Sequence, residues 1–214
     1  GPWMEDGYSE SPEIIGTVEP SFEQIAALTP DLILDTASSG EQARYDTLSG
    51  IATTIGPPEG ATAYQTPRDA QITMVATALG VPEKGEELVT ELDEQFAQAA
   101  ADHPEFAGKT VTVAAYTSDG WGAYVSRDAR VQFLQDLGFV NNPAVEAMAG
   151  DNFFVPVSDE NLGMLDSDLL LVLPIYVDSA EVTENPLFQQ LPVVQDGRYL
   201  VLDSGSDVAN AISL

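Results

Sequence analysis

The chain has 214 residues and a mass of 22.8 kDa, and it is 44% hydrophobic and 20% charged, which is typical of a globular protein with a sizeable core. Its 35 acidic and 7 basic residues give a formal net charge of −28, a field that would repel nucleic acid and anionic lipid. The sequence contains no cysteine, which excludes disulfides, thiolate metal sites and a cysteine nucleophile.

The first elements expected along the chain are a helix, a tight turn and a buried strand. Ser21 has the position of an N-cap, Pro30 ends the helix, and the aliphatic run at 32–34 predicts the strand. Beyond it we expect, in order, a polar loop over 36–45, a short helix to residue 51 and an extended segment around 53–55.

Two helices follow in the middle of the chain. Residues 69–79 have apolar side chains at helical spacing and end at Gly80 and Pro82. The second helix, 83–102, is the longest in the sequence and would span roughly 30 Å, enough to act as a rigid strut between two lobes. Its expected apolar face consists of Leu88, Leu92, Gln95, Phe96 and Ala99.

The second half alternates strands and helices. Residues 110–116 (TVTVAAY) predict a central strand, and the continuous aliphatic run LLLVL at 169–173 is typical of parallel strands that are covered on both faces. The remaining expectations are a loop over 117–128, a helix over 129–137, an irregular segment over 141–157 and a last strand over 197–202.

These elements predict an α/β fold with two α/β lobes, parallel sheets and one long rigid helix between the lobes. The expected division is a partial N-terminal lobe over 1–65, connecting helices over 66–103 and a C-terminal lobe over 104–214.

One pattern occurs twice: SFEQIAALTPDLIL at 21–34 and SDENLGMLDSDLLL at 158–171. A single Ser-x-Glu at a helix start is explained by capping and by the helix dipole. Two copies, in corresponding places of two lobes, indicate a protein that docks symmetrically on a two-subunit partner through one acidic contact on each lobe.

These residues resemble the substrate-binding proteins of ABC importers for ferric siderophores, haem and vitamin B12. The first motif with YDTLSGIATTI resembles their N-lobe, VSDENLGMLDSDLLLV and GRYLVLDSG resemble their C-lobe, and the long helix fits their single helical connection. The resemblance implies that Glu23 and Glu160 pair with arginines on the two permease subunits. Family members have more chain at both ends, which implies a fragment with an incomplete N-lobe.

The resemblance also implies delivery of a ferric siderophore, or alternatively haem or cobalamin, to an ABC permease dimer. The expected setting is extracytoplasmic, either periplasmic or lipid-anchored at the cell surface through an N-terminal anchor, with the protein a monomer. No cofactor and no nucleic acid partner are expected.

Ligands of open parallel sheets lie beyond the carboxyl ends of strands, and polar and aromatic residues occur in the loops expected there. Aromatic rings, hydroxyls and arginines suit a large anionic chelate by stacking, hydrogen bonding and charge. The ligand-binding residues expected on these grounds are Ser38, Ser39, Arg44, Tyr116, Trp121, Tyr124, Arg127, Phe153, Phe154 and Tyr176.

Two alternatives from other classes stay open. An acidic α/β enzyme could use carboxylates around a hard metal ion, either Asp166 with Asp168 or Asp203 with Asp207. The sequence has no nucleophile elbow or P-loop, and its single histidine, His103, has no evident acid partner, so we expect no enzyme and no metal centre. The other alternative is an adhesive surface protein without a small ligand.

Overall fold

The computed structural model describes residues 12–13, 15–16, 19–150 and 152–202. The chain divides into two compact units between Asp93 and Glu94, called here the N-terminal and the C-terminal unit. The boundary lies inside the long helix α4 (Pro82–Asp102), so the first half of that helix belongs to one unit and the second half to the other.

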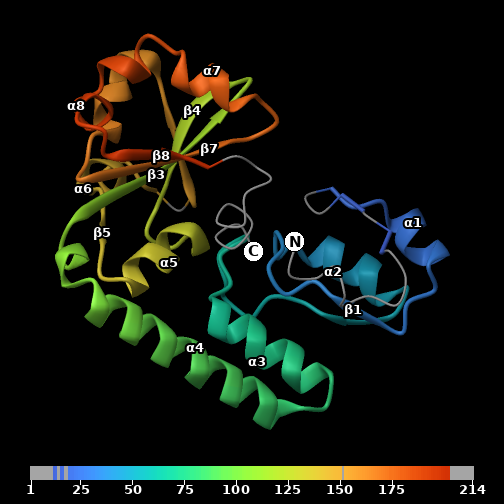
Figure 1. Cartoon of the computed structure of the whole chain (residues 1–214). Coiled ribbons are helices and arrows are strands. Elements are labelled where there is room, and N and C mark those ends of the chain that lie inside the picture. The colour runs from blue at the N-terminus through green and yellow to red at the C-terminus, as the bar shows by residue number, and fades with distance from the viewer. Residues whose placement is uncertain (1–11, 14, 17–18, 151, 203–214) are drawn as a thin grey trace. The chain divides into compact units, whose positions relative to one another are not determined.

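The N-terminal unit contains a two-stranded parallel sheet, in which Leu32 to Leu34 pair in register with Thr53 to Ile55. Figure 1 labels the first of these strands, β1. Its elements are α1 (Phe22–Ala27), β1 (Leu32–Leu34), α2 (Gln42–Ser49), β2 (Thr53–Ile55), α3 (Arg68–Ala78) and the first half of α4. The helices and strands expected in this part of the sequence are therefore confirmed, but α2 begins at Gln42, inside the segment expected to be a loop over 36–45.

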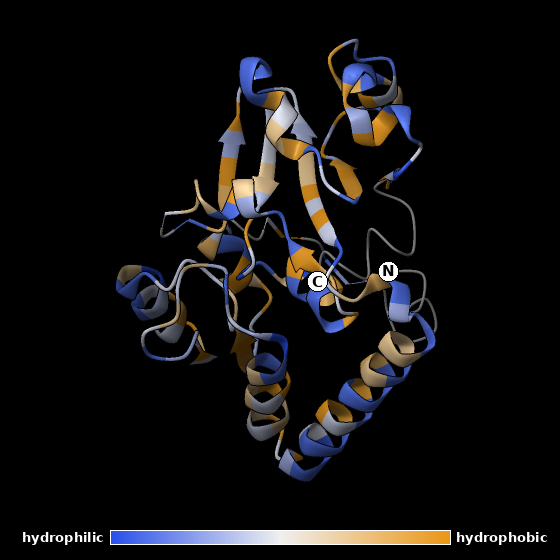
Figure 2. Cartoon of the chain, turned by 90° about the vertical axis from the view of Figure 1, so that its left-hand side faces the viewer, coloured by the Kyte–Doolittle hydropathy of each residue, from blue (hydrophilic) through white to orange (hydrophobic). Residues whose placement is uncertain are grey.

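Helix α4 is amphipathic, and hydrophobic and hydrophilic residues alternate along it in Figure 2. Its buried or half-buried positions include Gly85, Val89, Leu92 and Phe96. Leu88, at 42%, and Gln95 are exposed, so the expected face is wrong at those two positions. A Cβ on Gly85 would lie 2.6 Å from the Cβ of Ala76, which shows how closely α3 and α4 approach there.

The C-terminal unit is built around a six-stranded mixed sheet with the order β6-β4-β3-β7-β8, in which β5 also pairs with β3. Its elements are η2 (Pro104–Phe106), β3 (Thr110–Thr117), β4 (Gly120–Tyr124), α5 (Ala129–Asp136), β5 (Val140–Asn141), α6 (Pro143–Glu146), β6 (Phe154–Val157), η3 (Asp159–Leu165), β7 (Leu169–Pro174), α7 (Ser179–Thr183), η4 (Phe188–Gln190), α8 (Pro192–Gln195) and β8 (Tyr199–Val201).

The α/β class is confirmed, but the sheet of this unit is mixed, whereas parallel sheets were expected. Strands β3, β5, β7 and β8 are parallel, whereas β4 runs antiparallel to both β3 and β6. A two-residue turn at Ser118 and Asp119 joins β3 to β4, and Gly120 takes a φ of 107° that favours glycine. The segment expected to be a loop over 117–128 therefore contains β4, and the segment expected to be irregular contains β6.

Each face of this sheet is covered by its own apolar cluster, because side chains alternate along the strands. On β3, Val111, Val113 and Ala115 point to the face on which α5 packs, and Ala114 points to the opposite face with Trp121. The opposite face is covered by residues of α6, η3, α7, η4 and α8, which makes the unit a three-layer α/β/α sandwich.

Candidate functional site

The two repeated motifs lie in different units and in different sheets. In the first, the Oγ of Ser21 accepts a hydrogen bond from the backbone N–H of Gln24 at 3.3 Å and caps α1, with Glu23 exposed in the first turn. In the second, Glu160 is exposed at the start of η3, which is a 3-10 helix and not an α-helix. Each unit thus presents one exposed glutamate at the beginning of its copy of the motif.

The carboxyl end of β1 carries an ion pair. Asp35 follows the last residue of the strand, and its carboxylate accepts hydrogen bonds from Arg44 Nε at 3.0 Å and Nη2 at 2.5 Å. Both side chains are about nine-tenths buried, at 10% and 11% exposed. The hydrogen bond with Asp35 raises the pKa of Arg44 above its ordinary value, which keeps the guanidinium charged.

Two cavities adjoin this ion pair within the N-terminal unit. The first, called the ion-pair cavity, has a volume of about 410 Å³ and is lined by Ile15, Gly16, Pro20, Ile25, Ile33, Leu34, Asp35, Thr36, Ala37, Ser38, Arg44, Leu48 and Tyr64. The second, called the edge cavity, has about 490 Å³ and is lined by Asp35, Ser38, Gly40, Glu41, Gln42, Tyr45, Gly56, Pro57, Pro58, Glu59, Gly60 and Ala61. The lining of the edge cavity follows β1 and β2 directly in sequence, so it lies where α/β sheets bind ligands.

Three of the expected ligand residues belong to this region. Ser38 borders both cavities, and Arg44 borders the ion-pair cavity. Ser39 is half-buried, and its Oγ accepts a hydrogen bond from the backbone N–H of Glu41 at 3.4 Å. The structure therefore brings Ser38 and Arg44 together at one cavity.

Sequence reasoning missed two residues of this region, Asp35 and Tyr64. Asp35 could have been found as the first polar residue after the predicted strand. Tyr64 has a φ of 59°, which is uncommon for a residue with a side chain, and its backbone N–H donates to the carbonyl of Ser38 at 2.8 Å. No local sequence pattern predicts this left-handed backbone conformation.

In the C-terminal unit, the carboxyl ends of the parallel strands carry Tyr116, Trp121 and Tyr176. Trp121 is only 4% exposed, with its ring 4.5 Å from Tyr116 and stacked 5.6 Å from Phe188. The expectation that Trp121 lies in a loop is wrong, since it is a core residue of β4.

Tyr176 is the most exposed of the expected aromatic residues. It follows β7 by two positions, its side chain is fully exposed, and its φ is 59°. A left-handed backbone at a tyrosine stores strain, which often marks functional positions. Its assignment as a ligand contact stays a prediction.

The expected placement of Tyr124 and Arg127 beyond the carboxyl end of β3 is wrong. Because β4 runs back antiparallel to β3, its last residues lie toward the start of β3, and Asn141, which pairs with Val111, donates to the backbone carbonyl of Tyr124 at 3.3 Å. Tyr124 is 4% exposed, and burial raises its pKa.

Phe153 and Phe154 share this location, because Phe154 at the start of β6 pairs with Tyr124. Their ring centroids lie 6.4 Å and 5.3 Å from that of Tyr124. On another side of Tyr124, the guanidinium carbon of Arg130 lies 3.8 Å from the ring centroid. The aromatic cluster therefore packs within the unit, away from the carboxyl ends of the parallel strands.

Arg127 holds a neighbouring loop in place. Its Nη2 donates to the carbonyls of Gly150 at 2.8 Å and Asn152 at 3.3 Å. Next to it, Glu146 accepts hydrogen bonds from the N–H of Ser126 at 2.6 Å and from Asn141 at 2.5 Å. Burial acts to raise the pKa of Glu146, but these hydrogen bonds outweigh it and hold that pKa below its ordinary value.

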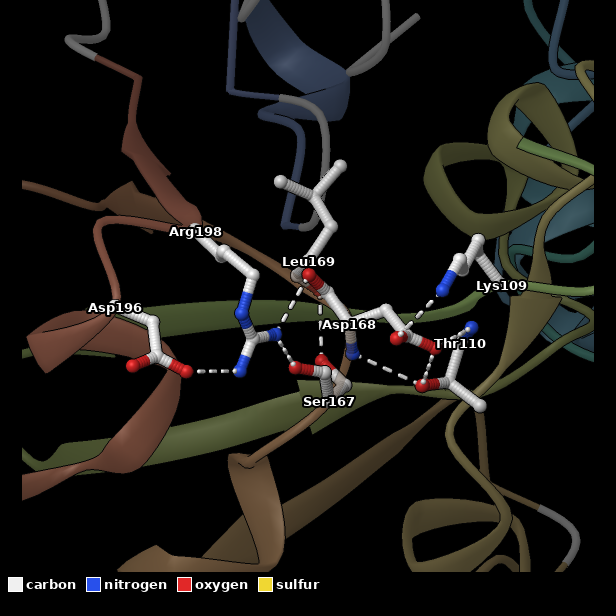
Figure 3. Close-up of polar contacts among 7 residues, drawn as sticks. All are labelled: Lys109, Thr110, Ser167, Asp168, Leu169, Asp196 and Arg198. Atoms are coloured by element: carbon white, nitrogen blue, oxygen red, sulfur yellow. Dashed lines mark hydrogen bonds and ion pairs between the residues drawn. The ribbon is translucent and has the colours of Figure 1, made fainter. Parts of the chain in front are cut away.

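A second polar cluster ties together the starts of the parallel strands (Figure 3). Asp168 accepts from the N–H of Thr110 at 2.8 Å, from its hydroxyl at 2.9 Å and from Lys109 at 3.3 Å. The backbone hydrogen bond from Thr110 is the main reason why the pKa of Asp168 is lowered. Arg198 donates to the carbonyls of Ser167 and Asp168 and pairs with Asp196 at 3.0 Å.

These contacts account for the carboxylates that were considered for a metal. Asp168 accepts hydrogen bonds from Thr110 at the start of β3. Asp166 accepts a hydrogen bond from the backbone N–H of Val193 at 2.8 Å. Among the residues that the structure describes, no three His, Cys, Asp or Glu side chains are grouped so that they could hold a metal ion. Asp203 and Asp207 lie outside the described residues.

His103 does have an acid partner, contrary to the expectation from sequence. Its Nδ1 lies 3.1 Å from Oε1 of Glu105, and both side chains are more than half exposed. A backbone hydrogen bond, followed by the side-chain hydrogen bond from His103, lowers the pKa of Glu105. The pair lies at η2, before the start of β3.

Residues 2–205 match the model of the periplasmic binding protein family, which covers both units described above. The chain belongs to this family. The match confirms the resemblance inferred from the repeated motif, and the mixed α/β sandwich is the fold of solved binding proteins of this kind. The relatives named below are described as binding proteins.

Three relatives illustrate the similarity of this periplasmic binding protein. It is 29% identical over 196 residues to the ferric enterobactin-binding periplasmic protein FepB of Escherichia coli O6:H1, covering 86% of this chain and 60% of that protein. It is 27% identical to the Fe(3+)-citrate-binding protein YfmC of Bacillus subtilis, and the match covers 88% of this chain and 58% of that protein. Among solved structures, PiaA from Streptococcus pneumoniae in complex with ferrichrome has a sequence 25% identical to this chain. The match covers 90% of this chain and 66% of PiaA, with a TM-score of 0.73.

The chain thus spans about 60% of the length of the curated relatives that it matches. Within the part of the chain that the structure describes, there is no helix long and apolar enough to cross a membrane.

Proposed function

We propose that this periplasmic binding protein captures a ferric siderophore outside the cytoplasmic membrane and delivers it to the permease of an ABC importer. Its role is to bind and hand over a ligand without chemical conversion. The observation that carries the proposal is the edge cavity, which has about 490 Å³ and opens where β1 and β2 end. Cavities of this volume are typical of small-molecule sites.

The relatives support the iron chelate as ligand. FepB is named for ferric enterobactin, YfmC for iron(III) citrate, and PiaA has been solved with ferrichrome. Of the expected contacts near the carboxyl ends of parallel strands, Ser38 and Arg44 border a cavity, Tyr116 is half-buried and Tyr176 is exposed. Trp121 lies there too, but it is buried in the core. We therefore assign ligand contact to the first four residues.

Delivery requires a docking surface, and Glu23 and Glu160 are the residues proposed for it. Each is exposed and each begins its copy of the repeated motif. Glutamates of this kind form strong charge-assisted hydrogen bonds with arginines on a partner. The partner would be a permease with two such arginine sites, and the binding protein would act as a monomer, free or tethered at the cell surface.

A titration tests the ligand assignment. The full chain is titrated by calorimetry with ferric siderophores, haem and cobalamin, and with each iron-free siderophore as the control. Binding of at least one ferric siderophore, with weaker binding of its iron-free form, is the expected result. Binding of haem or cobalamin alone would replace the siderophore as substrate, and binding of none of these would contradict the proposed function.

A further inference from the structure

We infer that the iron chelate recognised by this protein is uncharged or positively charged, as ferric tris-hydroxamates are, and is not a tris-catecholate or another strongly anionic complex. The inference rests on the proposed function and narrows its substrate class. It reverses the expectation of an anionic ligand that the arginines of the sequence suggested, because the structure shows where those arginines lie and what they contact.

The chain has 7 basic side chains, and all of them lie in the described part of the structure. Each contacts an acidic side chain or backbone carbonyls. The pairs are Arg44 with Asp35, Arg68 with Asp69 and Asp93, Lys84 with Glu87, Lys109 with Asp168, Arg127 with the carbonyls of Gly150 and Asn152, Arg130 with Asp128, and Arg198 with Asp196.

In the N-terminal unit, the lining of the edge cavity contains Asp35, Glu41 and Glu59 and no Lys or Arg among its described residues. Arg44 borders the adjoining ion-pair cavity, where Asp35 holds it through two hydrogen bonds. Three carboxylates and one guanidinium therefore lie near the carboxyl ends of β1 and β2. An anion placed there meets a negative potential, and a cation meets a favourable one.

The loops at the carboxyl ends of the parallel strands in the C-terminal unit are also negatively charged. The connections after β3 and β7 contain Asp119 and Asp178, both exposed, and residues 118–119 and 175–178 include no Lys or Arg. The sequence after β8 also contains no basic residue.

The basic residues of this unit lie toward the other end of its sheet. Lys109 and Arg198 precede β3 and β8, where they join the cluster around Asp168 (Figure 3). Arg127 and Arg130 follow β4, which runs back toward the start of β3. They are therefore placed away from the edge at which α/β sheets bind ligands.

The charge of an iron chelate depends on its donor groups. Three hydroxamate anions neutralise iron(III), and an additional amine on the chelator makes the complex cationic. Three catecholate dianions leave the complex strongly negative, and such a ligand needs basic side chains around it. Both carboxyl-end regions of this protein supply carboxylates instead, so they favour the neutral or cationic complex.

The test compares complexes of different charge on the full chain. Ferrichrome serves as a neutral tris-hydroxamate, an amine-bearing linear tris-hydroxamate as the cationic complex, and ferric enterobactin and iron(III) citrate as anionic complexes, each titrated at low and at high salt. We expect the better hydroxamate to bind at least about tenfold more tightly than either anionic complex. The affinity for the cationic complex should fall with added salt.

Charge variants locate the effect. Glu41→Gln and Glu59→Gln should each weaken binding of the cationic complex, and Glu86→Gln, an exposed change on α4 outside the cavity lining, should leave it unchanged. Anionic complexes that bind as tightly as the hydroxamates would overturn the inference and leave the proposed function standing. If no iron complex binds, the proposed function fails, and the inference fails with it.

Discussion

Asp35 and Arg44, nine residues apart, form a two-pronged ion pair at the carboxyl end of β1, with the two hydrogen bonds at 3.0 Å and 2.5 Å. The contributions of two nearly buried, paired charges to stability are coupled, because removal of one side chain leaves the charge of the other buried without a partner. The pair joins the strand end to α2, and Asp35 belongs to the lining of both cavities.

Replacement of Asp35 alone should destabilise the N-terminal unit. We expect Asp35→Ala to lower the free energy of unfolding by about 3 kcal/mol, because it leaves the guanidinium of Arg44 buried without its partner. The double variant Asp35→Ala, Arg44→Met should recover much of this loss, since it removes both charges. Urea unfolding monitored by circular dichroism measures the free energy of unfolding of the unaltered protein and of both variants. A double variant less stable than Asp35→Ala would contradict the energetic coupling of the two side chains.

Glu146 should make the stability of the C-terminal unit dependent on pH. Its pKa is lowered in the folded state, so its contribution is complete above the unfolded value of about 4.3 and is lost as the pH falls through the lower folded value. The thermal midpoint should therefore fall with pH in that range. Glu146→Gln keeps an acceptor oxygen and removes the titration, so its midpoint should change less over the same range; an unchanged slope would argue against this role.

Gly122 should not tolerate even a methyl group. A Cβ there would lie 1.8 Å from Cζ of Phe154, so Gly122→Ala must displace that ring. We expect a loss of about 1–3 kcal/mol in the free energy of unfolding. Gly163→Ala is the matched control, because its Cβ would meet nothing within 4 Å, and it should be neutral or slightly stabilising. Equal effects of the two changes would disagree with the packing seen at β4.

The buried position of Trp121 predicts its fluorescence. The sequence has 2 Trp residues, so a Trp3→Phe variant reports Trp121 alone. Because this ring is 4% exposed and stacked on Phe188, its emission should be blue-shifted relative to unfolded protein and weakly quenched by iodide. Strong iodide quenching in the folded variant would place Trp121 at the surface, as the sequence had suggested.

If Glu23 and Glu160 dock on the permease, their replacement should reduce transport and leave ligand affinity unchanged. Glu23→Ala and Glu160→Ala should each reduce transport by about tenfold or more in cells that carry the cognate permease, because each removes one charge-assisted pair. The affinity for the ferric siderophore should be unchanged. Glu86→Ala serves as the control for loss of an exposed carboxylate, and transport that is equally sensitive to it would count against specific docking.

Sequence periodicity predicted the elements with strong local signals. The apolar spacing of 69–79 and 83–102 predicted α3 and α4, and the β-branched run at 110–116 predicted β3, because these patterns report which side chains must leave water. Gly120 and Gly122, in contrast, made β4 look like a loop. The chain forms a strand there because both faces of the sheet bury it, with Phe154 filling the space over Gly122.

The sequence by itself determined the α/β class, the duplicated acidic motif and the scarcity of basic residues, because composition and local pattern are properties of the chain alone. Only the tertiary structure decided what each functional group faces. The direction of β4 moved Tyr124 and Arg127 away from the carboxyl ends of the parallel strands, and the approach of α2 to β1 paired Arg44 with Asp35. Strand direction and pairing depend on contacts between distant segments, and no local pattern encodes them.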